Sequence, residues 1–419
     1  MPESDRSIHR RRPVVVFYAY RITQSAAFTV PIFILFFRSR GLSFVQIGLI
    51  EAVYTVTVLV CETPTGYIGD RIGHRRSMLF GTCLSAIGAL GYAAAHTFPA
   101  FVVVAGLRGI AGTFRSGATE AWLYELLGRI DTQERFTAVS GRASAATTGI
   151  HGLAAVCGSV LYGVDHLLPW VLEAAVIGAG VPLLVTLPDV DTAASDRTAA
   201  AQPTATGPTG RQDRPGPRSI LRHTRRTLTT RALGAFVLYT ALLFGVVNTL
   251  EMFIQPVSVS IVGLAPESLG GLYAGLTVLA AVLASRSGWI KRVVGIGRWF
   301  GVVPIALAVA LLVVPAVPWV ALPVFAFHRA VAAVSRPLAG QYINDHAPSA
   351  SRATVLSSAS MVRSLVTAPL NTIGGAIATT LTLPLTLAAL GGLLLTGALG
   401  MLLWRFPVVD GTIRDRSAG

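Results

Sequence analysis

Ionisable side chains lie inside several long apolar stretches of this sequence. The neutral residues Gln24 and Asn248 accompany them, and the charged or titratable members are Arg21, Glu51, Glu62, Arg108, Arg115, Glu251, His328 and Arg329. An ionisable group in hydrocarbon is costly and is a functional candidate by default. Because arginine binds carboxylates and phosphates through a planar fork of donors, one interpretation is a cavity for an organic acid or a phosphate ester.

A second interpretation of the same residues stays open. The arginines can instead pair with glutamates and carbonyl groups, which would leave an amphipathic pocket suited to hydrophobic drugs. The aromatic side chains that could line such a pocket are Tyr18, Tyr20, Trp122, Phe244, Phe253 and Phe327.

Charge is also concentrated in one short segment, GYIGDRIGHRRSMLFG, at residues 66–81. It holds one acid, four basic side chains and four glycines between two apolar runs. On charge pattern alone, these basic residues could serve only to fix the orientation of the chain in a membrane.

The elements that carry these residues are predicted to be membrane-spanning helices. The chain has 419 residues, of which 53% are hydrophobic and 13% charged, against about 25% charged in ordinary soluble domains. A spanning helix needs roughly 20 apolar residues. Twelve spans are expected, at residues 14–37, 44–67, 77–96, 100–127, 137–161, 168–188, 232–258, 267–284, 297–315, 317–342, 353–379 and 381–404.

Basic residues predict the orientation of these spans. Arginine and lysine gather at the N-terminus and in the loops after the second, fourth, sixth and eighth spans, so both termini are expected in the cytoplasm. The net charge of +14 is thus largely a signal of topology rather than of nucleic-acid binding. A multi-pass protein of the cell (plasma or inner) membrane is expected.

The chain is expected to divide into two six-helix halves. Residues 1–188 and 232–405 form the halves, and residues 406–419 form a cytoplasmic tail. Residues 189–231 are rich in Ala, Thr, Pro and Gly and predict a flexible cytoplasmic linker. Residues 69–76 align with 284–291 and residues 134–140 with 351–357 at nearly one offset, which indicates parallel repeats.

These features together resemble the major facilitator superfamily of secondary transporters, over essentially the whole chain. The signature of that family is the loop after the second span, roughly G-x-x-x-D-R-x-G-R-R-R. Its matches here are Gly66, Asp70, Arg71, Gly73, Arg75 and Arg76. The resemblance implies an all-α membrane fold of twelve helices in two pseudo-symmetric bundles that work by alternating access.

In the family this loop is a latch on the cytoplasmic side. Asp70 is expected to face the N-terminal end of the helix near residues 352–356. Arg71 and Arg75 are expected to pair with Glu125, or else with Glu120. The glycines would allow close helix approach and a tight turn.

A second pattern, R-x-x-x-G in the fourth span, is matched by Arg108 and Gly112. In the family this arginine is associated with proton coupling, mainly in exporters, because a fixed positive charge tunes a nearby carboxylate. Glu51 or Glu62 is the expected carboxylate, and Glu251 a second one. A structural hydrogen bond from Arg108 to backbone carbonyls is the alternative.

The predicted function is a proton-coupled exporter of a small molecule. A proton symporter or uniporter for an organic anion or a sugar is the alternative, and a non-transporting membrane sensor is a further one. The sequence lacks a phosphate-binding loop and the H-E-x-x-H and G-x-S-x-G motifs, so we expect neither ATP-driven pumping nor an enzyme. The expected partners are the substrate, protons and the lipid bilayer; no cofactor, metal or nucleic acid is expected, and the chain is expected to be a monomer.

Overall fold

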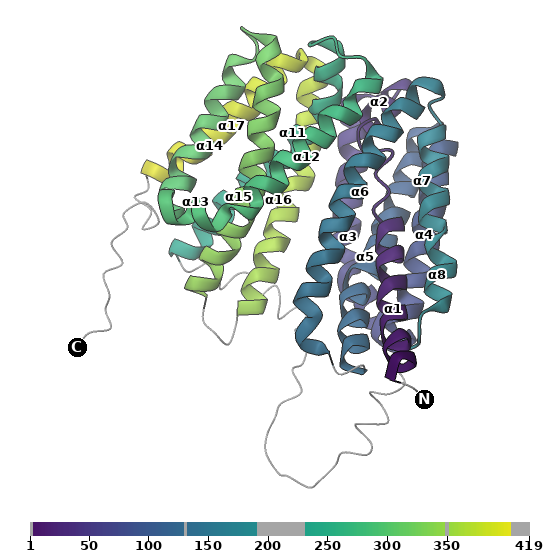
Figure 1. Ribbon diagram of the computed structural model, residues 1–419. Helices are drawn as coiled ribbons and strands as arrows, with labels where there is room; N and C mark the ends of the chain where they lie inside the picture. The colour runs from purple at the N-terminus through teal and green to yellow at the C-terminus, as the bar shows by residue number, and fades with distance from the viewer. Residues whose placement is uncertain (1–2, 130–131, 191–230, 348–351, 404–419) are drawn as a thin grey trace, which may run out of the picture. The chain divides into compact units, whose positions relative to one another are not determined.

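The computed structural model describes residues 3–129, 132–190, 231–347 and 352–403. These residues form helices and no strand, as Figure 1 shows, which confirms the predicted all-α class. Nearly all of the predicted linker and the whole predicted tail lie outside the described residues.

The first compact unit comprises residues Met1–Phe33, Val53–Thr209 and Pro266–Ala274. Its helices, including α3 and α12 that it shares, are α1 (Glu3–Thr23), α3 (Phe44–Ile72), α4 (His74–Ala94), α5 (Phe98–Arg129), η1 (Gln133–Arg135), α6 (Phe136–Val164), α7 (Leu168–Gly178), α8 (Gly180–Thr186), η2 (Pro266–Ser268) and α12 (Leu269–Ser285). The stretch from Pro266 is held on α6, where Ser159 Oγ donates to the Glu267 carbonyl at 2.8 Å. The same oxygen accepts a hydrogen bond from Gly270 N at 3.0 Å.

The second unit comprises residues Ile34–Ala52, Gly210–Ala265 and Gly275–Gly419. Besides its parts of α3 and α12, it contains α2 (Phe33–Ser39), α11 (Arg231–Ser260), α13 (Ser287–Val294), α14 (Ile296–Val313), η3 (Pro318–Val320), α15 (Ala321–His346), α16 (Arg352–Thr380) and α17 (Leu383–Leu403). The start of α3 packs closely on α16, because a methyl group at Gly375 would overlap the Phe44 carbonyl.

Ten helices among the described residues are long and apolar enough to cross a membrane. The other two predicted spans correspond to the α1–α2 pair and to the 29-residue α16. The twelve predicted spans therefore agree with the observed helices, with one correction.

The correction concerns the first predicted span, residues 14–37, which is not one helix. The chain leaves helical geometry between α1 and α2, over residues 24–32 (Figure 1). Pro31 lacks an N–H and disfavours helical geometry at Val30. Ser25 Oγ also donates to the Arg21 carbonyl at 2.9 Å, so a side chain competes locally with the backbone ladder.

Helices α4 and α5 pack with two glycines against two arginines. A methyl group at Gly81 would lie 2.6 Å from Arg115 Cγ, and one at Gly88 would lie 2.5 Å from Arg108 Cγ. The two glycines are seven residues apart on α4, and the two arginines are seven residues apart on α5. Seven residues make two helical turns, so each glycine of α4 meets one arginine of α5. This packing fixes the stems of both arginines.

Candidate functional site

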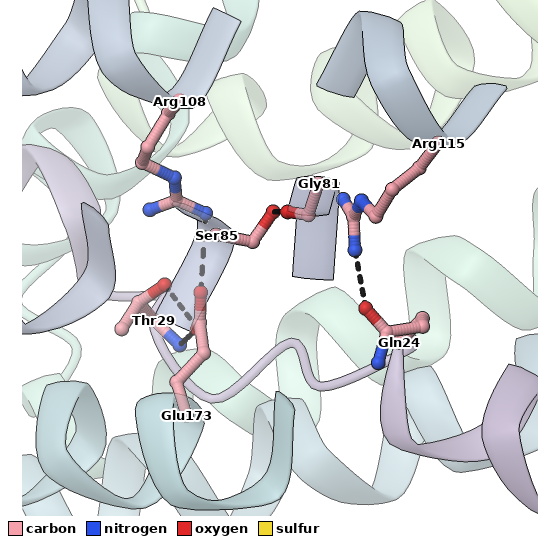
Figure 2. A network of polar contacts seen from close by, with 7 residues as sticks. All are labelled: Gln24, Thr29, Gly81, Ser85, Arg108, Arg115 and Glu173. Carbon is pink, nitrogen blue, oxygen red and sulfur yellow. Dashed lines mark hydrogen bonds and ion pairs between the residues drawn. The ribbon is translucent and has the colours of Figure 1, made fainter. Parts of the chain in front are cut away.

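A buried carboxylate anchors the polar network of the first unit (Figure 2). Glu173 on α7 is 2% exposed. Its Oε1 lies 3.2 Å from Arg108 Nη2 on α5. Its Oε2 accepts hydrogen bonds from Thr29 N at 3.1 Å and from Thr29 Oγ1 at 2.5 Å. One acid thus joins α5, α7 and the irregular segment between α1 and α2.

The second part of this network is centred on Arg115, which lies seven residues after Arg108 on α5 (Figure 2). Its Nη1 donates to Gln24 Oε1 at the start of the irregular segment. Gln24 Nε2 in turn donates to Thr23 Oγ1 at 3.0 Å and to the Ile177 carbonyl of α7 at 3.3 Å. The amide of Gln24 is therefore oriented, and its oxygen is directed at the guanidinium.

These contacts correct the expected partner of Arg108. Glu51 or Glu62 on α3 was expected, and the structure pairs Arg108 with Glu173 instead. Glu62 is exposed, and Glu51 belongs to the stretch of α3 in the second unit. The sequence held the signal for Glu173, because it is an acid inside the apolar span predicted at 168–188.

Two further predicted residues lie near this network. Arg21 is in the last turn of α1. At Gly112 a methyl group would meet only the Tyr54 hydroxyl, at an ordinary 3.8 Å, so close packing does not explain that glycine.

The second unit brings three predicted residues, Asn248, Glu251 and Arg329, together around a cavity of about 140 Å³. Its lining residues are Val247, Asn248, Glu251, Ala280, Arg329, Ala332, Ala333 and Arg336. Arg329 Nη2 lies 2.6 Å from Glu251 Oε2. The cavity is smaller than the roughly 300–1,000 Å³ of pockets for drug-sized ligands, so it suits a compact polar group.

His328 lies behind Glu251 and is fully buried. Its Nε2 is 2.8 Å from the Val247 carbonyl and 3.4 Å from Glu251 Oε1. Because a carbonyl only accepts hydrogen bonds, Nε2 carries the proton and donates it to the Val247 carbonyl. His328 thus lies beside the Glu251 carboxylate without lining the cavity itself.

The segment at 66–81 forms a tight turn between α3 and α4. Gly73 has φ 96°, a left-handed conformation that favours glycine, as the turn requires. Glu125 pairs with His74, whose Nε2 lies 3.3 Å from its Oε1, and not with Arg71 or Arg75 as expected. His74 is the first residue of α4, so its short ring reaches α5 directly.

The arginines of this turn have other partners. Arg75 Nη1 donates to the Leu187 carbonyl after α8 at 2.7 Å, and Nη2 is 4.0 Å from Asp189 Oδ2. Arg71 lies over the Tyr67 ring, with its guanidinium carbon 4.4 Å from the centroid. Arg75 is directed away from α5 because it donates to backbone carbonyl groups at the end of α8.

Three further latch residues have exposed side chains. Asp70 lies two residues before the end of α3, Arg76 lies in the first turn of α4, and Glu120 lies within α5, nine residues before its end at Arg129. A methyl group at Gly66 would meet no atom within 4 Å, so that glycine permits no close approach within the part of the chain described. The expected role of Asp70 toward residues 352–356 stays a prediction.

In the four described ranges, no group of three or more His, Cys, Asp or Glu side chains is placed to hold a metal ion.

Comparison with known proteins gives one family and a fold. The model of the family described as Major Facilitator Superfamily matches residues 17–371. No curated protein matches the sequence.

Three solved structures illustrate the likeness in fold. The nucleoside transporter NupG is 11% identical with a TM-score of 0.74, over 95% of this chain and 99% of that chain. A D-xylose-proton symporter is 15% identical with a TM-score of 0.68, over 95% and 98%. A POT family transporter in complex with a thioalcohol conjugated peptide is 13% identical with a TM-score of 0.66, over 93% and 95%. At these identities the likeness is one of fold.

Proposed function

The chain belongs to the Major Facilitator Superfamily of membrane transporters, and on that premise we propose that it couples proton movement to the transport of a small polar molecule. It is a transporter rather than an enzyme. The observation that carries the proton coupling is the Arg108–Glu173 pair in the first unit.

The chemistry of this pair supports a proton-dependent step. Glu173 is buried, lies 3.2 Å from the Arg108 guanidinium and accepts hydrogen bonds from two donors of Thr29. A proton on Glu173 would remove the attraction to Arg108 and one acceptor position for Thr29. The arrival of a proton would therefore loosen the contact between α5, α7 and the irregular segment at residues 24–32.

The surroundings of both polar clusters favour a polar substrate over a lipophilic drug. Four of the six aromatic side chains that could line a hydrophobic pocket are packed inside their units. Their exposed fractions are 1% for Tyr20, 0% for Trp122, 7% for Phe244 and 0% for Phe253. The cavity of the second unit instead presents Asn248, Glu251, Arg329 and Arg336.

Export by proton antiport is the direction we propose. It is supported by the R-x-x-x-G pattern at Arg108 and Gly112, which resembles that of exporters in the family. Proton symport is the second candidate, favoured because a D-xylose-proton symporter shares the fold with a TM-score of 0.68.

Proteoliposomes loaded with a pH-sensitive dye test this proposal. Organic acids, sugar phosphates, sugars and lipophilic drugs are added in turn to the wild type and to Glu173→Gln. We expect substrate-dependent proton movement in the wild type and its loss in the variant. Glu134→Gln, which removes an exposed acid, is the matched control and should behave as the wild type.

The outcomes of this experiment separately test the direction of transport, proton coupling and the role of Glu173. The sign of proton movement relative to substrate distinguishes antiport from symport. Substrate flux without proton movement would point to a uniporter, and binding without flux to a sensor; either would overturn proton coupling. Unchanged coupling in Glu173→Gln would remove Glu173 from the mechanism.

A further inference from the structure

Positive charge exceeds negative charge in the polar network of the first unit. Arg21 and Arg108 both lie within electrostatic range of Arg115. Among the described residues, the carboxylate that pairs with this group is Glu173, and it is bound to Arg108. A buried charge is normally paired with an opposite one, so an added anion would improve the charge balance of this network.

Arg115 has no acidic partner among the described residues. Its hydrogen-bond partner in the described part of the chain is the neutral amide oxygen of Gln24. Its Nε is buried and has no hydrogen-bond partner there. A guanidinium has five N–H donors, so Arg115 keeps several of them for a ligand.

The position of Arg115 is fixed by its surroundings. Gly81 on α4 makes room for its stem, since a methyl group there would lie 2.6 Å from Cγ and 2.8 Å from the Ala111 carbonyl. Gln24 holds the guanidinium end and is itself tied to the Ile177 carbonyl. A side chain held at both ends cannot readily move to the helix surface to be solvated.

Depth along the helix decides which anion could reach this residue. Arg115 lies 17 residues after the start of α5 and 14 before its end at Arg129. At 1.5 Å per residue, these distances are about 26 Å and about 21 Å along the axis. Lipid phosphates lie at the ends of spanning helices, so a small diffusible anion fits this position and a lipid head group does not.

We propose that Arg115, oriented by Gln24, binds the carboxylate or phosphate group of the transported molecule, so that the substrate is a small anion. This assignment rests on the proposed transport function but not on proton coupling. Arg108 and Glu173 then form the proton-responsive pair, and Arg115 is the substrate-binding arginine.

Thermal unfolding of the purified chain in a neutral detergent tests the assignment without any gradient. The probes are inorganic phosphate, glycerol 3-phosphate, glutarate and benzoate, each compared with an uncharged counterpart: glycerol for the phosphates, glutaramide and benzamide for the acids. We expect at least one anion, and none of the neutral compounds, to raise the Tm in a saturable manner. A panel in which no anion raises the Tm, or in which neutral counterparts do so equally, would overturn the proposal.

Variants then locate the bound anion. Arg115→Gln should abolish the anion-dependent rise in Tm, and Arg115→Lys should weaken it because a lysine lacks the planar fork. Gln24→Glu places a carboxylate beside Arg115 and should also cancel the rise, even where Arg115→Gln folds poorly. Glu134→Gln is the control and should respond as the wild type.

Two further results would contradict the proposal. An undiminished response in both Arg115→Gln and Gln24→Glu would place the anion elsewhere. A rise in Tm given by phosphatidylglycerol micelles and by no soluble anion would assign Arg115 to lipid. Loss of anion binding in Arg115→Gln, in a protein that moves no protons, would leave this inference standing while the proton-coupling proposal failed.

Discussion

Glu173 shows how a single acid can control a segment far away in the sequence. It is separated from Thr29 by 144 residues, and it accepts both hydrogen bonds that Thr29 can donate. Since Thr29 lies where α1 has ended and α2 has not begun, these bonds replace the helical ones that the segment lacks. The conformation of residues 24–32 is thus tied to the charge on one side chain.

Replacing Thr29 by valine should destabilise the protein by about 1.5–3 kcal/mol, because the shape is kept and one hydrogen bond to a charged acceptor is lost. Unfolding in mixed detergent micelles measures this. Thr147→Val removes an exposed hydroxyl that donates to the Ser144 carbonyl and should cost under about 0.5 kcal/mol. Equal losses in the two variants would mean that the bond from Thr29 to Glu173 contributes nothing.

At the scale of elements, α4 and α5 pack closely against each other as a pair of helices. Gly81 faces Arg115 and Gly88 faces Arg108. The helices can approach closely at the glycines, and the arginine stems fill the space that results. The same two contacts therefore set both the packing of the helices and the position of the two charges.

Alanine at Gly81 or Gly88 should cost about 1–3 kcal/mol through overpacking. Gly81→Ala should be the worse of the two, since its methyl group would also press on the backbone carbonyl of Ala111. Gly149→Ala on α6, where a methyl group meets nothing within 4 Å, is the matched control. Melting curves in detergent report the difference, and tolerance of both changes would disprove the tight packing.

The sequence predicts the helices better than it predicts their contacts. Hydropathy and the positive loops are local signals, so they give the number and order of spans. The break at residues 24–32 was missed because proline is common in spanning helices and does not by itself mark an interruption. Pro64, for example, lies inside the continuous helix α3.

The contacts of the site depend on which faces of the helices pack together, and a single sequence does not reveal which faces these are. Arg108 and Gln24 could be chosen as candidates because polar residues are rare in spans. Glu173 could have been chosen by the same rule, and His74 was not expected to replace an arginine as the partner of Glu125. Only the matching seven-residue spacings of Gly81 and Gly88, and of Arg108 and Arg115, hinted at their pairing.

At the scale of the whole molecule, alternating access predicts that the turn after α3 affects transport more than binding. Asp70→Asn should lower transport strongly and leave substrate binding largely intact, because it removes a charge expected to stabilise one closed state. Uptake into vesicles and binding in detergent measure the two quantities. Glu134→Gln is the control, and a normal transport rate in Asp70→Asn would remove Asp70 from the latch.

The way the two units share the chain has a consequence for how the protein can be assembled. The first unit includes residues Pro266–Ala274, and the second includes Ile34–Ala52. Two fragments produced by ending one chain at residue 210 and starting another at 211 would each lack a stretch of their own unit. Expressed alone, each fragment should be rapidly degraded, and expressed together they should be recovered as a complex after affinity purification through one tag. Stable fragments that accumulate separately would show that the exchanged stretches are dispensable, whereas obligate co-assembly would allow the transporter to be produced as two separately controlled pieces that are active only together.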